Sequence, residues 1–223
     1  MARQLLFIRI KLKEVAMKLS IYQLKPQFQR ILAPLLQALI DWKISPNQIT
    51  IFTMSLSVLF GFLLAMFPAN FCLWVAFPVF MFLRMALNAI DGMLANVSGQ
   101  KTALGALLNE MCDQISDVAL YLPFALLLQL SAPLLIVVVV MALLSEFAGV
   151  IATLIGASRR FDGPMGKSDR AFCFGLLALF VVTKLEPIWL NSLLSIMLLL
   201  LLLTIFNRLQ QALQQRQILP PTR

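Results

Sequence analysis

The sequence contains no histidine, and only 13% of its 223 residues are charged. Without histidine, neither a Ser-His-Asp triad nor a histidine-ligated zinc site can form, so any catalysis must rest on carboxylates, amides, hydroxyls and cations. Cysteine is also scarce. Cys72, Cys112 and Cys173 lie far apart in apolar stretches without C-x-x-C spacing, which indicates small core side chains rather than metal ligands or disulfides.

Hydrophobic residues, in contrast, make up 61% of the chain, and its mean hydropathy is +0.90. A soluble domain is about 45–50% apolar and about 25% charged, so the composition excludes a soluble enzyme and is typical of an all-α integral membrane protein. A spanning helix needs roughly 20 mostly apolar residues. Six segments qualify when polar residues at their inner ends are allowed, and they predict six transmembrane helices at 49–67, 71–95, 103–130, 133–155, 171–185 and 188–206.

Lysine and arginine are distributed unevenly around these spans. Eight precede the first span, one lies between the second and third, four lie between the fourth and fifth, and three follow the last, whereas the opposite loops hold only Lys184. By the positive-inside rule, both termini are cytoplasmic, and the membrane is the inner membrane if the source is bacterial. Topology and anionic headgroups also explain the net charge of +8, so we expect no nucleic-acid binding. The expected organisation is a cytoplasmic segment at 1–48, a six-helix domain at 49–206 and a cytoplasmic tail at 207–223.

The segment before the first span is predicted to be an interfacial amphipathic helix. Residues 24–42 carry apolar side chains at helical spacing around Lys25, Arg30 and Asp41, and they are too few and too polar to span a bilayer. The preceding residues leave two interpretations open. Either Met1 begins a basic arm that binds anionic lipids, or translation starts at Met17, and the intact mass of the natively expressed protein distinguishes the two.

Half of the ten acidic residues fall within predicted spans: Asp91, Glu110, Asp113, Asp117 and Glu146. A charge in the bilayer costs several kcal/mol unless it is paired, hydrated or bound to metal, so such residues usually have a function. A structural alternative applies to Arg84, Asp117 and Glu146, which lie at similar expected depths and could form buried ion pairs.

Two oxygen-rich helix faces lie near the cytoplasmic ends of the second and third spans. Asn88 and Asp91 are three residues apart on one helix, while Asn109, Asp113 and Asp117 are four apart on the next, so each set shares a face. Oxygen ligands suit Mg²⁺ or Mn²⁺, which favour carboxylates, waters and substrate phosphates. The sequence therefore predicts a metal and phosphate site made by these residues.

Residues 88–113 resemble the signature of the CDP-alcohol phosphotransferase family, which is D-x-x-D-G-x-x-A-R, eight residues, and G-x-x-x-D-x-x-x-D. The register matches without a gap at Asp91, Gly92, Ala95, Gly105 and Asp113. Asparagine stands at the first and third aspartate positions, 88 and 109, and at the arginine position, 96. In the family, the four aspartates hold two divalent cations, and the last is the proposed base for the acceptor hydroxyl. The resemblance thus implies Mg²⁺ or Mn²⁺ as cofactor and Asp113 as the catalytic base.

Two flanking stretches extend the resemblance. Pro46, Asn47 and Thr50 look like the family's P-N-x-x-T element near the cytidine nucleotide, which also implies nucleotide contacts for the signature's two glycines and its alanine. Residues 166–170, Gly-Lys-Ser-Asp-Arg, are loosely similar to an acceptor-contacting loop of some members. A basic cluster there suits a phosphorylated acceptor such as glycerol phosphate or inositol phosphate, although membrane topology alone also explains it; its members are Arg159, Arg160, Lys167 and Arg170.

The resemblance implies that domain 49–206 is catalytic. It would transfer the phosphatidyl group of CDP-diacylglycerol to an alcohol, release CMP and act as a homodimer. One alternative is a catalytically silent member that binds the CDP-lipid or supports a partner enzyme. A small transporter with acidic coupling sites is a third possibility, but the motif has no inverted repeat.

Overall fold

The computed structural model describes residues 25–218, with side chains from residue 30, and this part of the chain is helical without any strand. The elements in chain order are α2 (Lys25–Asp41), α3 (Pro46–Met66), α4 (Phe71–Val97), α5 (Ala103–Tyr121), the 3-10 helix η2 (Leu122–Leu126), α6 (Ala132–Ile151), the 3-10 helix η3 (Ala152–Ile155), α7 (Lys167–Val182) and α8 (Pro187–Ile218). Both interpretations of the amino terminus concern residues outside this described range.

Local side-chain caps explain where the helices that carry the signature begin. Ser45 and Gln48 form a capping box at the start of α3, and proline follows the cap, where its missing N–H costs nothing. The side chain of Asn70 accepts a bond from the backbone N–H of Cys72 at 3.0 Å and so caps α4. Thr102 caps α5 by accepting a bond from the backbone N–H of Gly105. These caps fix the residues at which the first, second and third predicted spans begin.

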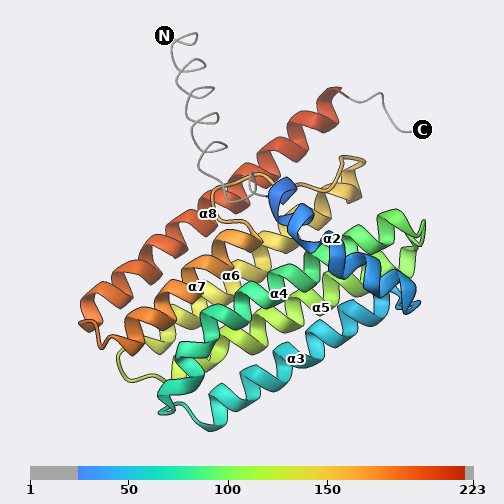
Figure 1. Cartoon of the computed structure of the whole chain (residues 1–223). Coiled ribbons are helices and arrows are strands. Elements are labelled where there is room, and N and C mark those ends of the chain that lie inside the picture. The colour runs from blue at the N-terminus through green and yellow to red at the C-terminus, as the bar shows by residue number, and fades with distance from the viewer. Residues whose placement is uncertain (1–24, 219–223) are drawn as a thin grey trace.

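The long helices form one bundle in which α3 packs along α5 and α4, α4 packs along α7, and α6 packs along α8 (Figure 1). An aromatic cluster fills the end of the bundle remote from α2. Trp74 and Phe77 of α4 meet Phe124 of η2 at ring-centroid distances of 4.7 and 5.1 Å, and Tyr121 stacks on Phe174 of α7 at 3.8 Å. These rings tie α4, α5, η2 and α7 together, and Tyr121 also interacts electrostatically with Arg84 and Asp117.

Within residues 25–218, four helices are long and apolar enough to cross a membrane: Pro46–Met66, Phe71–Val97, Ala132–Ile155 and Pro187–Ile218. The other two predicted spans differ from the expectation. The third does not continue to 130 as one α-helix, because α5 ends at Tyr121 and passes into η2, and α5 carries Glu110, Asp113 and Asp117. The fifth, α7, has 16 residues and begins at Lys167, before the expected start at 171. Both nevertheless pack within the bundle, beside α3 and α4 respectively (Figure 1).

A helix, α2, occupies the segment before the first span and lies against α4 (Figure 1). Leu36 is buried together with Ile49, Ile90 and Leu94, whereas Ile31 and Trp42 remain exposed. At the other end of the chain, α8 continues well beyond the expected end of the sixth span at 206. Side chains that were expected in a cytoplasmic tail therefore belong to a continuous helix.

Candidate active site

The start of α3 lies against the signature part of α4. Thr50 donates a hydrogen bond from Oγ1 to Oδ2 of Asp91 at 2.9 Å, and both residues are buried. The same hydroxyl lies 3.1 Å from the carbonyl oxygen of Pro46, one turn earlier. The P-N-x-x-T element and the second signature aspartate, 41 residues apart in the sequence, are therefore direct neighbours.

Asp113, the last signature aspartate, receives donors on both carboxylate oxygens. Asn88 of α4 donates from Nδ2 to Oδ1 at 3.1 Å, and the ammonium of Lys167 at the start of α7 pairs with Oδ2. Arg84 donates to the backbone carbonyl of Asp113 at 3.1 Å, and its Nη2 lies 3.8 Å from Oδ1. Asp91 also interacts electrostatically with Asp113 and Lys167. Three helices thus meet at these side chains.

The glycines and asparagines of the signature occupy different environments. A Cβ on Gly105 would lie 3.0 Å from Oδ1 of Asn47, so the absence of a side chain lets the start of α5 approach the start of α3. A Cβ on Gly92 would meet nothing within 4 Å, which leaves open space beside Asp91. Asn109 is half-buried one turn before Asp113, and Asn96 is exposed near the end of α4.

The side-chain oxygen atoms that could ligate a metal at this site suit a hard divalent cation, but they are few. Asp91 and Asp113 supply carboxylates, while the side-chain amides of Asn88 and Asn109 supply neutral oxygens. Among residues 25–218, no group of three or more His, Cys, Asp or Glu side chains is placed to hold a metal ion. The two carboxylates together balance the charge of one divalent cation, so the residues fit one such ion.

Asp117, which was also expected to face the metal, instead belongs to a buried set of charges that we name the central ion-pair network. Arg84 contacts Oδ1 of Asp117 at 2.6 Å and Arg170 contacts Oδ2 at 3.0 Å. Arg170 also pairs with Glu146 at 2.8 Å, and Arg208 pairs with the same carboxylate oxygen at 3.3 Å. Guanidinium groups therefore pair with both carboxylate oxygens of Asp117, and Arg84, Asp117 and Glu146 all belong to buried ion pairs that also include Arg170 and Arg208.

Sequence reasoning missed Arg208 and assigned Arg170 to a different environment. Arg208 was expected in a tail, but α8 carries it to 1% exposure, where it donates to the backbone carbonyls of Ser145 and Asp162. Arg170 was placed with the acceptor-binding residues, yet it is 1% exposed and both of its terminal nitrogens are occupied in the central ion-pair network. An arginine two residues beyond an apolar run was the available signal for Arg208.

The remaining basic residues lie on the loop between η3 and α7. Arg159 pairs with Glu110, contacts Oε2 of Glu146 at 3.5 Å and lies 4.6 Å above the ring of Phe161. Arg160 donates to Asp162 at 2.7 Å. Of the four predicted acceptor-binding residues, only Lys167 directly contacts a signature aspartate.

The same loop is held in place by α8. Gln215 accepts hydrogen bonds on Oε1 from the backbone N–H of Ser158 at 3.2 Å, from its hydroxyl at 2.9 Å and from Arg160 at 3.1 Å. Closer to the site, the backbone N–H of Met165 donates to Oγ1 of Thr204 at 3.0 Å. The loop that leads to Lys167 therefore has a defined shape.

Residues 43–212 match the sequence model of the CDP-alcohol phosphatidyltransferase family. The chain belongs to this family. It is 45% identical to the inner membrane protein YnbA of Escherichia coli over 198 residues, which cover 87% of this chain and 97% of YnbA. It is also 35% identical to the phosphatidylinositol phosphate synthase of Corynebacterium glutamicum over 103 residues, although this match covers only 46% of this chain and 45% of the synthase.

Solved structures of a phosphatidylinositol phosphate synthase share the fold. Mycobacterium tuberculosis phosphatidylinositol phosphate synthase PgsA1 in complex with manganese and citrate superposes with a TM-score of 0.69 at 19% identity, over 85% of this chain and 92% of PgsA1. PgsA1 with CDP-DAG bound gives a TM-score of 0.65 at 22% identity, over 84% and 94% of the two chains. The recognised family and its helical architecture are therefore confirmed.

Proposed function

We propose that this protein is an active CDP-alcohol phosphatidyltransferase that transfers the phosphatidyl group of CDP-diacylglycerol to an alcohol and releases CMP. The observation that carries this proposal is the meeting of three separate signature elements at one place. Thr50 bonds to Asp91, Asn47 lies against Gly105, and Asp113 faces α4 and α7. The CDP-DAG bound to the structural relative PgsA1 and the manganese in another of its structures support the choice of donor and of cofactor.

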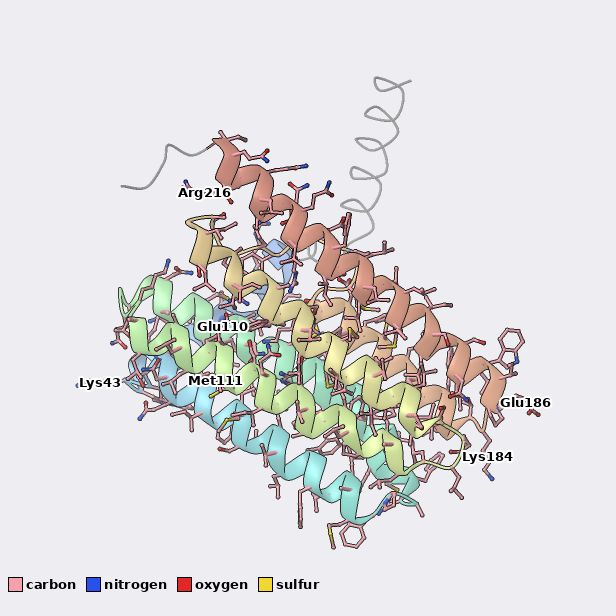
Figure 2. The ribbon with its side chains drawn as sticks, turned by 180° about the vertical axis from the view of Figure 1, so that it is seen from behind. Lys43, Glu110, Met111, Lys184, Glu186 and Arg216 are labelled. Atoms are coloured by element: carbon pink, nitrogen blue, oxygen red, sulfur yellow. The ribbon has the colours of Figure 1, made fainter. Side chains whose placement is uncertain are left out.

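The proposed setting is a six-span membrane protein with both termini in the cytoplasm, which acts as a homodimer. Lys43 and Arg216 lie at one end of the bundle, whereas Lys184 and Glu186 lie at the opposite end (Figure 2). With the basic end in the cytoplasm, the signature residues open toward the side where soluble acceptors and CMP occur. α5 and α7 then cross the membrane with their charged side chains turned to other helices, which avoids exposing those charges to lipid.

The reaction needs charge neutralisation and proton removal. Asp91, Asp113 and the amide oxygens of Asn88 and Asn109 would hold Mg²⁺ or Mn²⁺, which would offset the negative charge of the departing CMP. Pro46, Asn47 and Thr50 contact the cytidine nucleotide together with the backbone at Gly92, Ala95 and Gly105. Asp113 accepts the acceptor's hydroxyl proton as the acceptor oxygen bonds to the lipid-side phosphorus, and the bond from that phosphorus to CMP breaks.

We also propose that the acceptor carries a phosphate or another anionic group. The ammonium of Lys167 pairs with Asp113. An acceptor whose anionic group contacts this lysine is therefore positioned next to the base. Arg159 and Arg160 extend positive charge along the adjoining loop, and Arg170 holds the beginning of α7 from inside the bundle. An uncharged alcohol would lack this positioning contact.

The test is a CMP-release assay with purified protein, CDP-diacylglycerol, Mg²⁺ or Mn²⁺ and a panel of free and phosphorylated alcohols. The wild type is expected to release CMP with at least one phosphorylated alcohol, and Asp91→Asn or Asp113→Asn is expected to abolish release because each removes a charged oxygen ligand. Glu186→Gln removes the same charge at the far end of the bundle and serves as the matched control (Figure 2). Retained turnover in either aspartate variant would contradict the proposed site.

A catalytically silent member is the second candidate, and one observation favours it. Both oxygens of Asp113 already have protein donors, Asn88 and Lys167, which compete with a metal and with an acceptor hydroxyl. The silent candidate predicts saturable binding of CDP-diacylglycerol by the wild type without CMP release for any alcohol. Binding and release measured on the same preparation therefore separate the two candidates.

A further inference from the structure

The charge at the signature site is much lower than four aspartates would provide. Asp91 and Asp113 are the two acidic residues at the four signature positions, because asparagine occupies positions 88 and 109. Two carboxylates carry a charge of −2, which one divalent cation balances and a second leaves strongly positive. Asp91 is 5% exposed, so water screens little of that excess.

A fixed cation already lies at the same site. Lys167 places its ammonium on Oδ2 of Asp113, while Asn88 donates to Oδ1 of the same carboxylate. The position of this lysine is fixed by its surroundings. Lys167 is the first residue of α7, and the loop before it is bound to α8 by the hydrogen bond from Met165 to Thr204. A metal ion bound to Oδ2 of Asp113 would therefore lie next to the positive ammonium of Lys167.

The asparagine on α4 is suited to this arrangement in a way that aspartate is not. An amide can donate a hydrogen bond to Asp113, and Asn88 does so at 3.1 Å, whereas an aspartate there would repel that carboxylate unless a metal ion lay between them. The exchange of aspartate for asparagine thus removes the need for a bridging cation. Lys167 of α7 also makes a bridging cation unnecessary, because its ammonium already pairs with Asp113.

We propose that this protein binds one divalent cation per chain, on the Asp91 side of the site, and that the ammonium of Lys167 supplies the positive charge on the Asp113 side in place of a second metal ion. The inference rests on the proposed function, because it concerns the same site. It differs from the four-aspartate pattern of the family, for which two cations were expected, and it assigns Lys167 a second role besides contact with the acceptor.

The experiment is an Mn²⁺ titration of the purified full chain in detergent micelles, without substrate, in which electron paramagnetic resonance counts free Mn²⁺. The wild type is expected to bind one Mn²⁺ per chain. The double variant Asn88→Asp with Asn109→Asp is expected to bind two, because it restores two carboxylates. Lys167→Gln is expected to keep one site and bind Mn²⁺ about tenfold more tightly, because a repelling charge is gone.

Lys184→Gln removes an identical charge at the opposite end of the bundle and is expected to leave the Mn²⁺ affinity unchanged (Figure 2). Two Mn²⁺ ions per wild-type chain, no saturable binding, or unchanged or weaker binding by Lys167→Gln would each overturn the inference. The lysine variant decides the question if the double asparagine variant does not fold. The titration contains no substrate, so its result does not depend on whether the protein releases CMP. If the protein releases CMP and binds two Mn²⁺ ions, only this inference is overturned and the proposed function stands.

Discussion

Replacement of Glu146 by glutamine is expected to destabilise the protein more than replacement of Arg170, because Glu146 pairs with three arginines whereas Arg170 pairs with two carboxylates. The central ion-pair network sets three guanidiniums, those of Arg84, Arg170 and Arg208, against the carboxylates of Asp117 and Glu146. All three arginines are at most 3% exposed. Glu146→Gln therefore leaves three buried cations facing one buried anion.

The magnitude follows from what each substitution leaves unpaired. Removing one partner of a buried pair costs about 3–5 kcal/mol, because an uncompensated charge remains, and Glu146→Gln should fall in this range. Arg170→Met leaves Arg84 paired with Asp117 and Arg208 paired with Glu146, so it should cost less, about 1–3 kcal/mol for the lost hydrogen bonds. The double variant should be more stable than Glu146→Gln alone, because it also removes a stranded guanidinium.

The assay is denaturant unfolding in detergent micelles, followed by tryptophan fluorescence, on the wild type, both single variants and the double variant. Glu186→Gln, an exposed residue at the far end of the bundle, should shift stability by less than about 0.5 kcal/mol. Additive single effects, or a double variant less stable than Glu146→Gln, would refute the charge-balance reasoning. A smaller cost for Glu146→Gln than for Arg170→Met would refute it as well.

Three further predictions concern packing, the acceptor and the loop. Gly61→Ala should destabilise the protein by about 1–3 kcal/mol in the same unfolding assay, because its Cβ would clash with the backbone carbonyl of Ala119 in α5. Gly175→Ala, whose Cβ would lie 3.7 Å from its nearest neighbours, should be neutral or stabilising in that assay. Lys167→Gln should raise the KM for a phosphorylated acceptor more than the KM for CDP-diacylglycerol, and equal effects would favour a topological role only. Gln215→Ala should speed amide hydrogen exchange at residues 158–160, and unchanged exchange would show that α8 does not hold the loop.

Much of the candidate site was predictable because helical periodicity converts sequence spacing into shared faces. Asp91, Gly105 and Asp113 lie at the signature spacing, and Thr102, which lies in the same stretch, caps the helix that carries Gly105 and Asp113. The contact of Thr50 with Asp91 is also consistent with the resemblance, which had placed the P-N-x-x-T element near the nucleotide. These residues are close in sequence or belong to a known pattern.

Other parts of the site were not predictable from spacing. Lys167 and Arg170 are three residues apart and were grouped as one basic cluster, yet the first reaches Asp113 and the second is buried against Asp117 and Glu146. The position of each on α7 relative to α5 and α6 makes this difference, and no local propensity reports it. Sequence reasoning also ended the last span two residues before Arg208, which hid its role.

The sequence by itself determined the membrane setting, the family and the chemical types at the signature positions, because composition, hydropathy and fixed spacing are properties of short stretches of chain. Only the tertiary structure decided which charges face one another. Pairings such as Lys167 with Asp113 and Arg208 with Glu146 join residues 54 and 62 positions apart, on helices whose relative rotation depends on the packing of the whole bundle. In a buried, weakly screened interior, that rotation decides which carboxylate is paired with which cation.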